Sequence, residues 1–220
     1  MKNIIHIYLI GNNINLENHL PHLPNQEQHH LTQLTSQVSQ QNYLLSRSLL
    51  RQLLSPLLSL PPHKINFEKT PSKKPILAPT YGLTNLHFNI SHCPGAILIG
   101  LHEKPIGVDL ENINRPCSFL KLAKRHFTPE EYQDCKRHNS IHYFLQLWTL
   151  KEAYAKSMGQ GIYASFKSFT VQNTHTSNPS IKNKKNQVTL QSHTLDNYII
   201  GLAIQHPKAH PLPIVNHTLK

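Results

Sequence analysis

Two hydrophobic stretches, 96–102 (AILIGLH) and 198–204 (YIIGLAI), constrain the fold most, because each is typical of a buried strand that follows a polar strand and a turn. Each half of the chain also opens with a strand and continues into a helix. Duplication of one unit explains this order most simply. We therefore expect an α+β fold of two similar α/β subdomains, 1–104 and 105–220, packed as a pseudo-dimer. Each half should contain an antiparallel sheet and a long helix.

The first half contains one clear helix and two segments without strong periodicity. Residues 11–42 are rich in Asn, Gln and His, so part of this segment is expected to be loop. Apolar residues at helical spacing predict a helix that begins near residue 43. Pro56 should limit that helix, because proline lacks an N–H group and clashes with the preceding turn. The Pro- and Lys-rich segment 70–80 is expected to be loop.

The second half carries stronger local signals. Thr128, Pro129 and Glu131 form a capping-box pattern, which predicts that a helix begins there. A longer helix is expected over 140–158. Apolar or alternating runs predict strands at 2–11, 64–68, 86–92, 95–102, 105–111, 187–193 and 197–205.

The stretch 105–113 (PIGVDLENI) places two carboxylates in an apolar run, although the chain has 11 acidic residues against 22 Lys and Arg. Because side chains alternate along a strand, Asp109 and Glu111 should project from one face while their apolar neighbours face a core. The plain alternative is a solvent-facing strand end with two ordinary acids. An open pair of carboxylates suits a hard divalent cation such as Mg²⁺.

The predicted helix over 140–158 offers a third carboxylate, Glu152. Apolar residues occur on both sides of this helix, and Trp148 and Lys156 share a side with Glu152. We therefore expect Glu152 to be partly buried, where an ionised carboxylate needs a partner. The alternatives are an i,i+4 ion pair between Glu152 and Lys156 on an exposed helix, and an ordinary core position for Trp148.

Charge and composition indicate which partners and which cellular compartment suit the protein. The formal net charge of +11 predicts a surface that attracts anions, such as nucleic acid, anionic lipid, a phosphorylated ligand or an acidic protein. The 3 Cys form no C-x-x-C pattern, which favours a reducing compartment over a disulfide framework. The sequence has neither an apolar run long enough to span a membrane nor a signal-peptide pattern. We expect a soluble, cytoplasmic protein.

Five stretches resemble, in order along the chain, the signatures of the 4′-phosphopantetheinyl transferase superfamily: SRSLLRQLLS, KPI followed by LHFNISH, IGVDLE, FTPEEY and WTLKEAYAKSMGQG. The resemblance spans about residues 36–206. In its length and apparent duplication, the chain is similar to the larger, single-chain, pseudo-dimeric members of the superfamily. It implies transfer of 4′-phosphopantetheine from coenzyme A to a serine of an apo acyl or peptidyl carrier protein, with release of 3′,5′-ADP.

The resemblance also implies roles for residues of the second half. Asp109, Glu111 and Glu152 would hold Mg²⁺, with Mn²⁺ as an alternative, and Asp109 would also lie against coenzyme A. Lys156 would contact a pyrophosphate oxygen as a catalytic and cofactor-binding group. Lys151 is a candidate to contact phosphate or to assist deprotonation of the serine.

Further roles follow for the remaining motif residues. Glu131 is a candidate base, with its capping role as the alternative. Arg47, Lys74, Ser91 and His92 match the positions that bind coenzyme A at its adenosine end, where a 3′-phosphate must be recognised. Arg suits phosphate because its planar guanidinium donates two parallel hydrogen bonds.

Two other functions compete with the transferase prediction. One is a basic nucleic-acid-binding protein, although the sequence has no recognisable nucleic-acid-binding module. The other is a non-catalytic relative that binds coenzyme A or a carrier protein, against which the intact acidic and lysine positions argue. The expected partners are coenzyme A and an acidic carrier protein, without nucleic acid or membrane. A monomer is expected because the duplication supplies both halves of the site.

Overall fold

The computed structural model describes residues 3–11, 13–70, 74–83, 85–159, 166–174, 176, 179–183, 187–206 and 210–219. Its helices are α1 Asn25–Gln33, α2 Gln37–Leu58, α3 Phe119–His126, α4 Pro129–His138 and α5 Ile141–Ser157, with short 3₁₀ helices η1 Leu16–His22, η2 Pro62–Lys64, η3 Pro79–Tyr81 and η4 Phe166–Ser168. Its strands are β1 Ile4–Ile10, β2 Phe67–Lys69, β3 Pro75–Leu77, β4 His87–Cys93, β5 Ala96–His102, β6 Ile106–Asn112, β7 Val171–Gln172, β8 Ser180–Ile181, β9 Thr189–Leu195, β10 Tyr198–Ile204 and β11 Ile214–Leu219.

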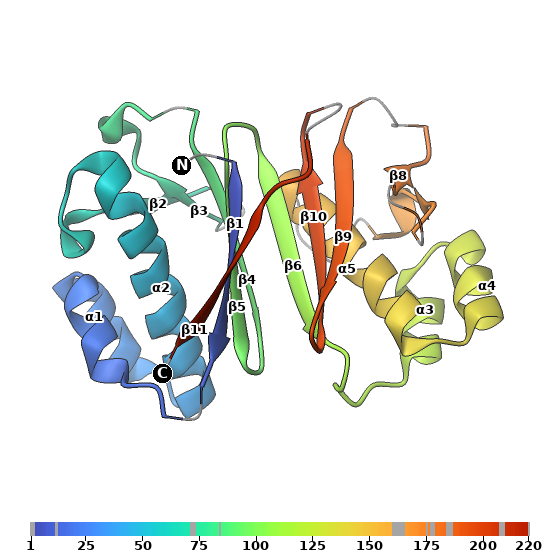
Figure 1. Ribbon diagram of the computed structural model, residues 1–220, viewed down its shortest axis with the longest axis horizontal. Coiled ribbons are helices and arrows are strands. Elements are labelled where there is room, and N and C mark those ends of the chain that lie inside the picture. Colours follow the sequence, from blue (N-terminus) through green and yellow to red (C-terminus); the bar gives the residue numbers. More distant parts are fainter. Residues whose placement is uncertain are drawn as a thin grey trace.

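Two sheets pack against each other between two helical layers (Figure 1). One sheet has the strand order β11-β1-β5-β4 and the other β6-β10-β9. Ile5, Val108 and Leu202 belong to the apolar core between the sheets, and two further cores lie beneath α2 and α5. The nearly continuous apolar runs of the middle strands β5 and β10 explain this arrangement, because both of their faces are covered.

The two halves repeat one order of elements. A strand (β1 or β6) is followed by a long helix (α2 or α5) and then by a hairpin (β4–β5 or β9–β10). In both sheets the last strand of the unit lies in the middle, giving β1-β5-β4 and β6-β10-β9. The echoing stretches that suggested duplication are these two middle strands. The predicted α+β fold with two similar halves is confirmed.

The end of the chain departs from this repeat. Strand β11 pairs with β1 of the first sheet, with Ile214 opposite Ile5, and the pairing is parallel where antiparallel sheets were expected. Leu212, just before β11, is buried in the core between the sheets, and its N–H donates to the side chain of Gln191 on β9. The C-terminal segment therefore contacts both sheets.

The first half is more helical than the sequence suggested. The Asn/Gln/His-rich segment forms η1 and α1, and α2 begins at Gln37 with Ser36 as its N-cap, well before residue 43. Pro56 lies inside the last turn of α2, and the helix continues to Leu58. A proline so close to the end costs few backbone hydrogen bonds, which is why it does not stop the helix earlier. Within the predicted loop 70–80, Pro75–Leu77 forms β3.

The local signals of the second half are confirmed. Thr128 and Glu131 form a reciprocal capping box at the start of α4. Helix α5 begins after the N-cap Ser140 and ends at Ser157, followed by Gly159 with a φ of 69°. That left-handed conformation suits glycine, because it has no Cβ atom.

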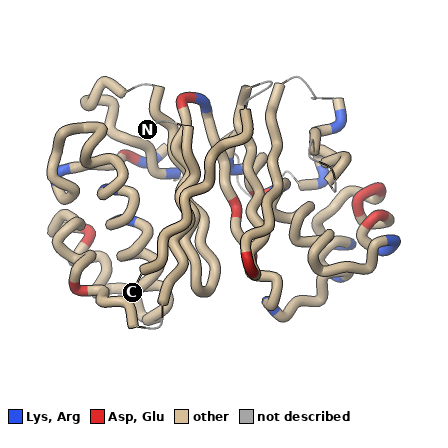
Figure 2. The backbone as a smooth tube through the Cα atoms, in the orientation of Figure 1, with Lys and Arg blue, Asp and Glu red and all other residues tan. Residues whose placement is uncertain are grey.

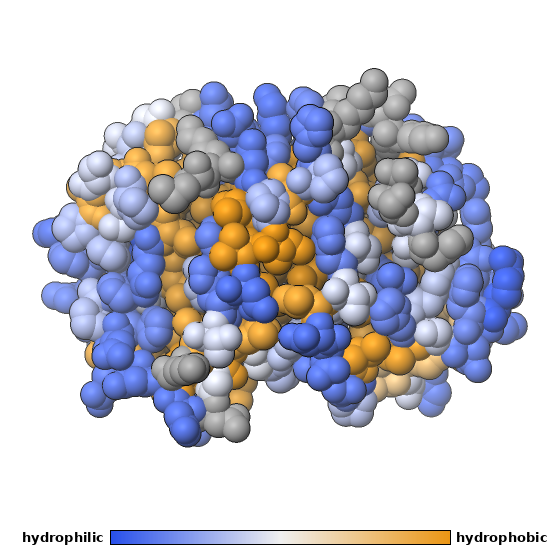
Figure 3. Space-filling view, viewed as in Figure 1, coloured by the Kyte–Doolittle hydropathy of each residue, from blue (hydrophilic) through white to orange (hydrophobic). Residues whose placement is uncertain are grey.

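Charged and apolar residues are distributed unevenly. Lys and Arg occur in both halves (Figure 2), and apolar residues gather along the middle of the face shown in Figure 3, over the strands. In the described part of the chain, no helix has the length and hydrophobicity that a membrane span requires.

Candidate active site

Helix α5 packs closely against β6 and β10 because two glycines leave room for it. A Cβ atom at Gly107 or at Gly201 would clash with the backbone of α5. Asp109 is two residues after Gly107 in β6, so its side chain projects from the same face, toward α5. The close approach brings Asp109 and Glu152 to one cavity.

That cavity, of about 410 Å³, opens where β4, β6 and α5 meet, at the seam between the two halves. Its lining contains the three carboxylates Asp109, Glu111 and Glu152. The same cavity is lined by Ile90, Ser91, His92, Leu110, Arg115, Trp148 and Lys156. Residues far apart in sequence, which the motifs singled out separately, thus share one site.

Asp109 is the most strongly connected of the three carboxylates. Its Oδ1 atom accepts hydrogen bonds from Ser91 Oγ at 2.8 Å and from Lys156 Nζ at 2.7 Å. Lys156 Nζ also donates to the carbonyl oxygen of Val108 at 3.2 Å. The Oδ2 atom of Asp109 is buried and has no hydrogen-bond partner within the described residues. An unpaired buried carboxylate oxygen is costly, so this atom is a position for a cation or a hydrogen-bond donor.

Glu152 is 5% exposed and shares the cavity with two other acids. Burial, together with the nearby carboxylates of Asp109 and Glu111, raises the pKa of Glu152 to about 8, although the ammonium of Lys156 opposes the shift. Burial and the neighbouring acids thus favour the protonated form of Glu152, and a further cation in the cavity would favour the ionised form.

Glu111 is paired with a residue that the motifs did not indicate. Arg115 Nη1 donates to Glu111 Oε1. Burial raises the pKa of Glu111, and the hydrogen bond from Arg115 acts in the opposite direction. Lys156 and Arg115 thus each neutralise one acid of the cavity.

The donor set suits a hard divalent cation. Among the residues that the structure describes, no three His, Cys or carboxylate side chains form a ready metal-binding group. Lys156 and Arg115 occupy oxygens of Asp109 and Glu111. Carboxylate oxygens are the ligands that Mg²⁺ prefers, and the buried Oδ2 atom of Asp109 has no hydrogen-bond partner among the described residues.

The predicted nucleotide-binding residues border this cavity. Arg47 and His92 line a second cavity of about 410 Å³, which shares Ile90 and His92 with the first. His92 is exposed at the junction of the two. The guanidinium of Arg47 lies 5.5 Å from the ring centre of Tyr43 and 5.7 Å from that of Phe67. An anion that spans the two cavities can contact both halves of the protein.

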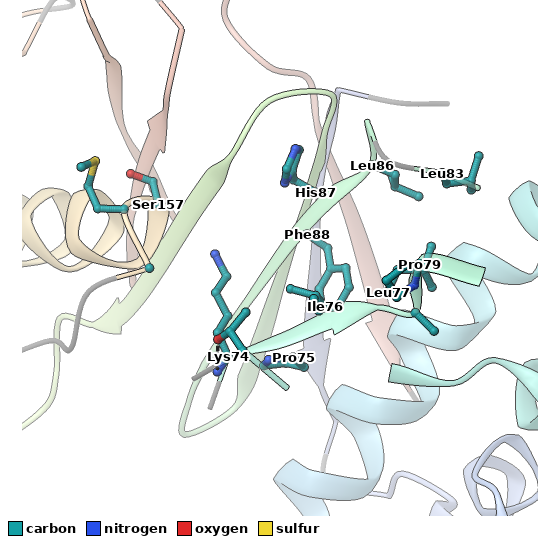
Figure 4. A pocket seen from close by; sticks show the side chains of 14 residues that line it. Lys74, Pro75, Ile76, Leu77, Pro79, Leu83, Leu86, His87, Phe88 and Ser157 are labelled. Carbon is teal, nitrogen blue, oxygen red and sulfur yellow. Dashed lines mark hydrogen bonds between the residues drawn. The ribbon is translucent and has the colours of Figure 1, made fainter. Parts of the chain in front are cut away.

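Lys74 lies at the mouth of a third, largely apolar cavity of about 390 Å³ (Figure 4). Its Nζ atom donates to the carbonyl oxygen of Lys156 at 2.9 Å, which ties the first half to the end of α5. Burial and the nearby Lys156 lower the pKa of Lys74. This cavity and the one that Arg47 lines have the lining residue Pro75 in common.

Lys151 and Glu131, two predicted catalytic residues, lie together and apart from the residues that line the acidic cavity. Lys151 Nζ contacts both carboxylate oxygens of Glu131, at 2.7 and 2.8 Å, and donates to the carbonyl oxygen of Phe169 at 2.8 Å. Glu131 also accepts from the N–H groups of Thr128 and Val171. The side chains of Lys151 and Glu131 are 0% and 1% exposed, respectively. Neither residue lines the acidic cavity, and the Lys151 ammonium and the Glu131 carboxylate are satisfied by each other and by the backbone.

The sequence motifs did not indicate one residue of the cavity lining, Arg115, or a neighbouring contact made by Asn89. Arg115 follows β6 in a turn where no periodic pattern exists, and its position four residues after Glu111 was the available signal. Asn89 was also missed; its side chain accepts from the N–H of Val108 at 2.8 Å and joins β4 to β6. Such a contact between separate sheets has no local sequence signature.

Two family models match consecutive parts of this chain. The model described as "4'-phosphopantetheinyl transferase, N-terminal" matches residues 13–100, and the model described as "4'-phosphopantetheinyl transferase superfamily" matches residues 105–203. The matches cover both halves of the fold and both sides of the acidic cavity. The chain therefore belongs to the 4′-phosphopantetheinyl transferase superfamily, which confirms the resemblance of its motifs.

Curated relatives carry the same description. The chain is 32% identical to 4′-phosphopantetheinyl transferase gsp of Aneurinibacillus migulanus, over 67% of this chain and 61% of that protein. It is 29% identical to psf-1 of Bacillus pumilus, over 76% and 72%, and 33% identical to Sfp of Bacillus subtilis strain 168, over 59% and 57%. The chain thus spans between 57% and 72% of the length of these three relatives.

Two solved structures are similar over less than half of this chain. The holo-(acyl-carrier-protein) synthase of Bacillus anthracis in complex with CoA (3′,5′-ADP) has a TM-score of 0.40 and 23% identity, over 47% of this chain and 96% of that chain. The holo-[acyl-carrier-protein] synthase of Helicobacter pylori in complex with coenzyme A has a TM-score of 0.35 and 23% identity, over 45% and 97%.

Proposed function

We propose that this chain transfers the 4′-phosphopantetheine group from coenzyme A to a serine of an apo acyl or peptidyl carrier protein and releases 3′,5′-ADP. In this reaction the serine oxygen bonds to the phosphorus of the phosphopantetheine. The bond from that phosphorus to the oxygen of 3′,5′-ADP breaks, and the hydroxyl proton passes to an acceptor.

One observation carries the proposal. The carboxylates Asp109, Glu111 and Glu152 converge with Lys156 in a cavity at the seam. That cavity shares Ile90 and His92 with the cavity that Arg47 lines, and Lys74 donates to the carbonyl oxygen of Lys156. A pyrophosphate needs its charge neutralised, and positioned cations do this best in a site partly shielded from water. Membership of the superfamily gives the same reaction class.

The side chains of the cavity have distinct tasks in this proposal. The ammonium of Lys156 leaves Asp109 and donates to a pyrophosphate oxygen instead. Lysine suits this change of partner, because its ammonium is compact and its side chain is flexible. Ser91 donates to Asp109 and keeps its carboxylate oriented. Lys151 and Glu131, the predicted candidates to accept the serine proton, are paired with each other in this structure, so one of them would have to exchange its partner to act.

Magnesium dependence is part of the proposal. Asp109, Glu111 and Glu152 would hold Mg²⁺, or Mn²⁺ as an alternative, through their oxygens, including the unpaired Oδ2 atom of Asp109. A bound divalent cation would neutralise the pyrophosphate and stabilise the leaving group. Lys156 and Arg115 would then be released from the acids toward the substrate.

The adenosine end of coenzyme A is assigned to the first half. Arg47, Ser91 and His92 would contact phosphate where the first two cavities join, and Lys74 would contact the nucleotide beside the apolar cavity of Figure 4. An apolar cavity with a cation at its mouth suits a base attached to phosphates. The proposed site therefore lies between subdomains 1–104 and 105–220, and one chain working as a monomer would suffice.

An acidic carrier protein would approach along α3. This helix exposes Lys121, Lys124 and Arg125, while its apolar residues pack on the second-half core. His126 at its end contacts the ring of Trp148, a residue of the cavity lining, at 5.7 Å between ring centres. Opposite charge speeds encounter and orients the partner. We also propose that the protein is cytoplasmic and that it binds neither nucleic acid nor membrane.

Intact-mass spectrometry of the carrier tests the proposed function. The chain is incubated with coenzyme A, Mg²⁺ and an apo carrier protein, in parallel with samples that lack coenzyme A or contain a chelator. We expect the carrier to gain the mass of one phosphopantetheine in the complete reaction, and no gain in the two controls.

Two outcomes would contradict the proposal. No gain on any apo carrier, whether from fatty-acid or secondary-metabolite synthesis, combined with binding of coenzyme A, would indicate a non-catalytic relative. Salt-dependent binding of DNA without any affinity for coenzyme A would indicate a nucleic-acid-binding protein.

A further inference from the structure

The guanidinium of Arg47 is held in a partly buried position beside the second cavity. Its side chain is 18% exposed, and its Nη1 atom lies 3.8 Å from Glu27 Oε1. The rings of Tyr43 and Phe67 lie near its Cζ atom, at 5.5 and 5.7 Å from their centres. Two aromatic rings and one carboxylate therefore lie close to the guanidinium of Arg47, and Tyr43 lines the same cavity as Arg47.

Glu27 is itself anchored by a second arginine. Arg51 Nη1 donates to Glu27 Oε2 at 2.8 Å, and the Arg51 side chain is 1% exposed. Arg51 Nε donates to the carbonyl oxygen of Ile65 at 3.2 Å, and its Cζ atom lies 4.7 Å from the ring centre of Phe67. A buried guanidinium must keep its carboxylate, so one oxygen of Glu27 is committed and the other is fixed on the side of Arg47.

The three charges leave one positive charge for a ligand. Glu27 neutralises Arg51 through a short hydrogen bond, whereas its distance to Arg47 exceeds that of a hydrogen bond. The donors of Arg47 thus remain available to an anion in the cavity, while the carboxylate restricts the rotamers of the side chain. Restriction before binding improves affinity, because less conformational entropy is lost when the complex forms.

We propose that Glu27 is a positioning residue, which holds the guanidinium of Arg47 toward the cavity in the orientation that receives a phosphate group. This assigns a role to α1, the helix in the Asn/Gln/His-rich segment that carries Glu27. The identity of the phosphate, as part of coenzyme A and of 3′,5′-ADP, rests on the proposed function. The contacts from Arg51 to Glu27 and from Glu27 to Arg47 are independent of the proposed function.

The test compares Glu27→Gln with Glu17→Gln, which removes an exposed carboxylate from the same N-terminal segment. The dissociation constant of 3′,5′-ADP is measured by calorimetry, and KM for coenzyme A and kcat are measured per folded molecule. We expect Glu27→Gln to raise the dissociation constant and KM about three- to tenfold, with kcat unchanged. Glu17→Gln should change neither. In an Arg47→Met background, Glu27→Gln should have no further effect on binding.

Opposite results separate the explanations. Tighter binding by Glu27→Gln would overturn the inference, because Glu27 would then compete with phosphate. An equal loss of affinity with and without Arg47 would also overturn it. If Glu27→Gln does not fold, Glu27→Asp keeps a carboxylate for Arg51 and shortens its reach to Arg47, and the same rise in KM is expected.

The inference and the proposed function fail in different ways. A wild-type chain that binds 3′,5′-ADP but transfers no group would contradict the proposed function and leave the positioning role intact. An active wild type with an unaltered Glu27→Gln variant would contradict the positioning role alone. A wild-type chain without affinity for 3′,5′-ADP would contradict both.

Discussion

Two lysines of helix α5 make ion pairs of the same length in different surroundings. Lys151 lies 2.7 Å from Glu131, and Lys156 lies 2.7 Å from Asp109. The first pair is fully enclosed by protein, whereas Lys156 is 16% exposed at the acidic cavity. Distance alone therefore does not distinguish a structural ion pair from one that can take part in a reaction.

The remaining acceptors make the distinction. Both oxygens of Glu131 are engaged by Lys151 and by backbone N–H groups. Asp109 keeps one buried oxygen without a partner among the described residues, and two further carboxylates lie in its cavity. A closed pair stabilises the fold, while an open pair can exchange its partner for a substrate or a cation.

The largest effect is expected where the closed pair is broken. Lys151→Met keeps most of the side-chain volume but leaves the buried carboxylate of Glu131 without its cation. We expect the free energy of unfolding to fall by about 3 to 5 kcal/mol. Urea denaturation followed by circular dichroism measures this loss.

An adjacent pair provides the matched control. Lys182→Met breaks the ion pair between Lys182 and Glu130. The two side chains are 48% and 49% exposed, respectively. Its cost should stay below about 1 kcal/mol. Equal costs for the two variants would mean that enclosure does not separate the two kinds of pair.

A smaller effect is expected from the protonation of the open site. Since the pKa of Glu152 is raised to about 8, the folded chain keeps a proton that the unfolded chain releases near its ordinary pKa of 4.5. The contribution of this group to stability is therefore greatest below pH 4.5 and falls as the pH rises toward 8. A divalent cation favours the ionised form of Glu152, so Mg²⁺ should raise Tm more at pH 8 than at pH 6. We expect the two increases in Tm to differ by about 3 to 5 °C.

Glu152→Gln should remove both the pH dependence and the response to Mg²⁺ in a thermal melt. Glu103→Gln, at an exposed position, should leave both as they are in the wild type. A Glu152→Gln variant that responds to Mg²⁺ like the wild type would exclude Glu152 as a ligand.

The smallest effect concerns the second cation of the open site. Arg115→Gln frees Glu111 from a half-exposed guanidinium, whose side chain is 35% exposed. We expect the half-saturating Mg²⁺ concentration for transfer to fall about two- to fivefold, because one competitor is removed. Arg137→Gln, which loses an exposed pair with Asp134, is the control. A rise in the required Mg²⁺ concentration would mean that Arg115 supports the metal site.

The sequence predicted those parts of the fold that local chemistry determines. The capping box of α4, the N-cap of α5 and the alternation along β6 act over a few residues, and each element forms where it was expected. The same alternation, with the helical spacing of Glu152, was enough to predict one acidic cavity. The superfamily resemblance added the first-half residues that border it.

Other features depend on contacts that the sequence does not display. Strand β11 is stabilised by pairing with β1 at the opposite end of the chain, and its own pattern gives little sign of a strand. Helix α1 contains polar residues throughout and packs on α2 through partners such as Arg51. The burial of Lys151 with Glu131 was missed for the same reason, because α4 and α5 approach each other only in the folded protein.

We expect the open pair of Asp109 and Lys156 to take part in the transfer reaction, and the closed pair of Glu131 and Lys151 to be needed for stability. The most direct measurement is the transfer rate per folded molecule of Asp109→Asn and Glu131→Gln, with the folded fraction taken from a thermal melt. We expect Asp109→Asn to fold like the wild type and to lose on the order of 100-fold or more in transfer rate. Glu131→Gln should be less stable but transfer at nearly the wild-type rate once folded. A folded, inactive Glu131→Gln beside an active Asp109→Asn would contradict both expectations.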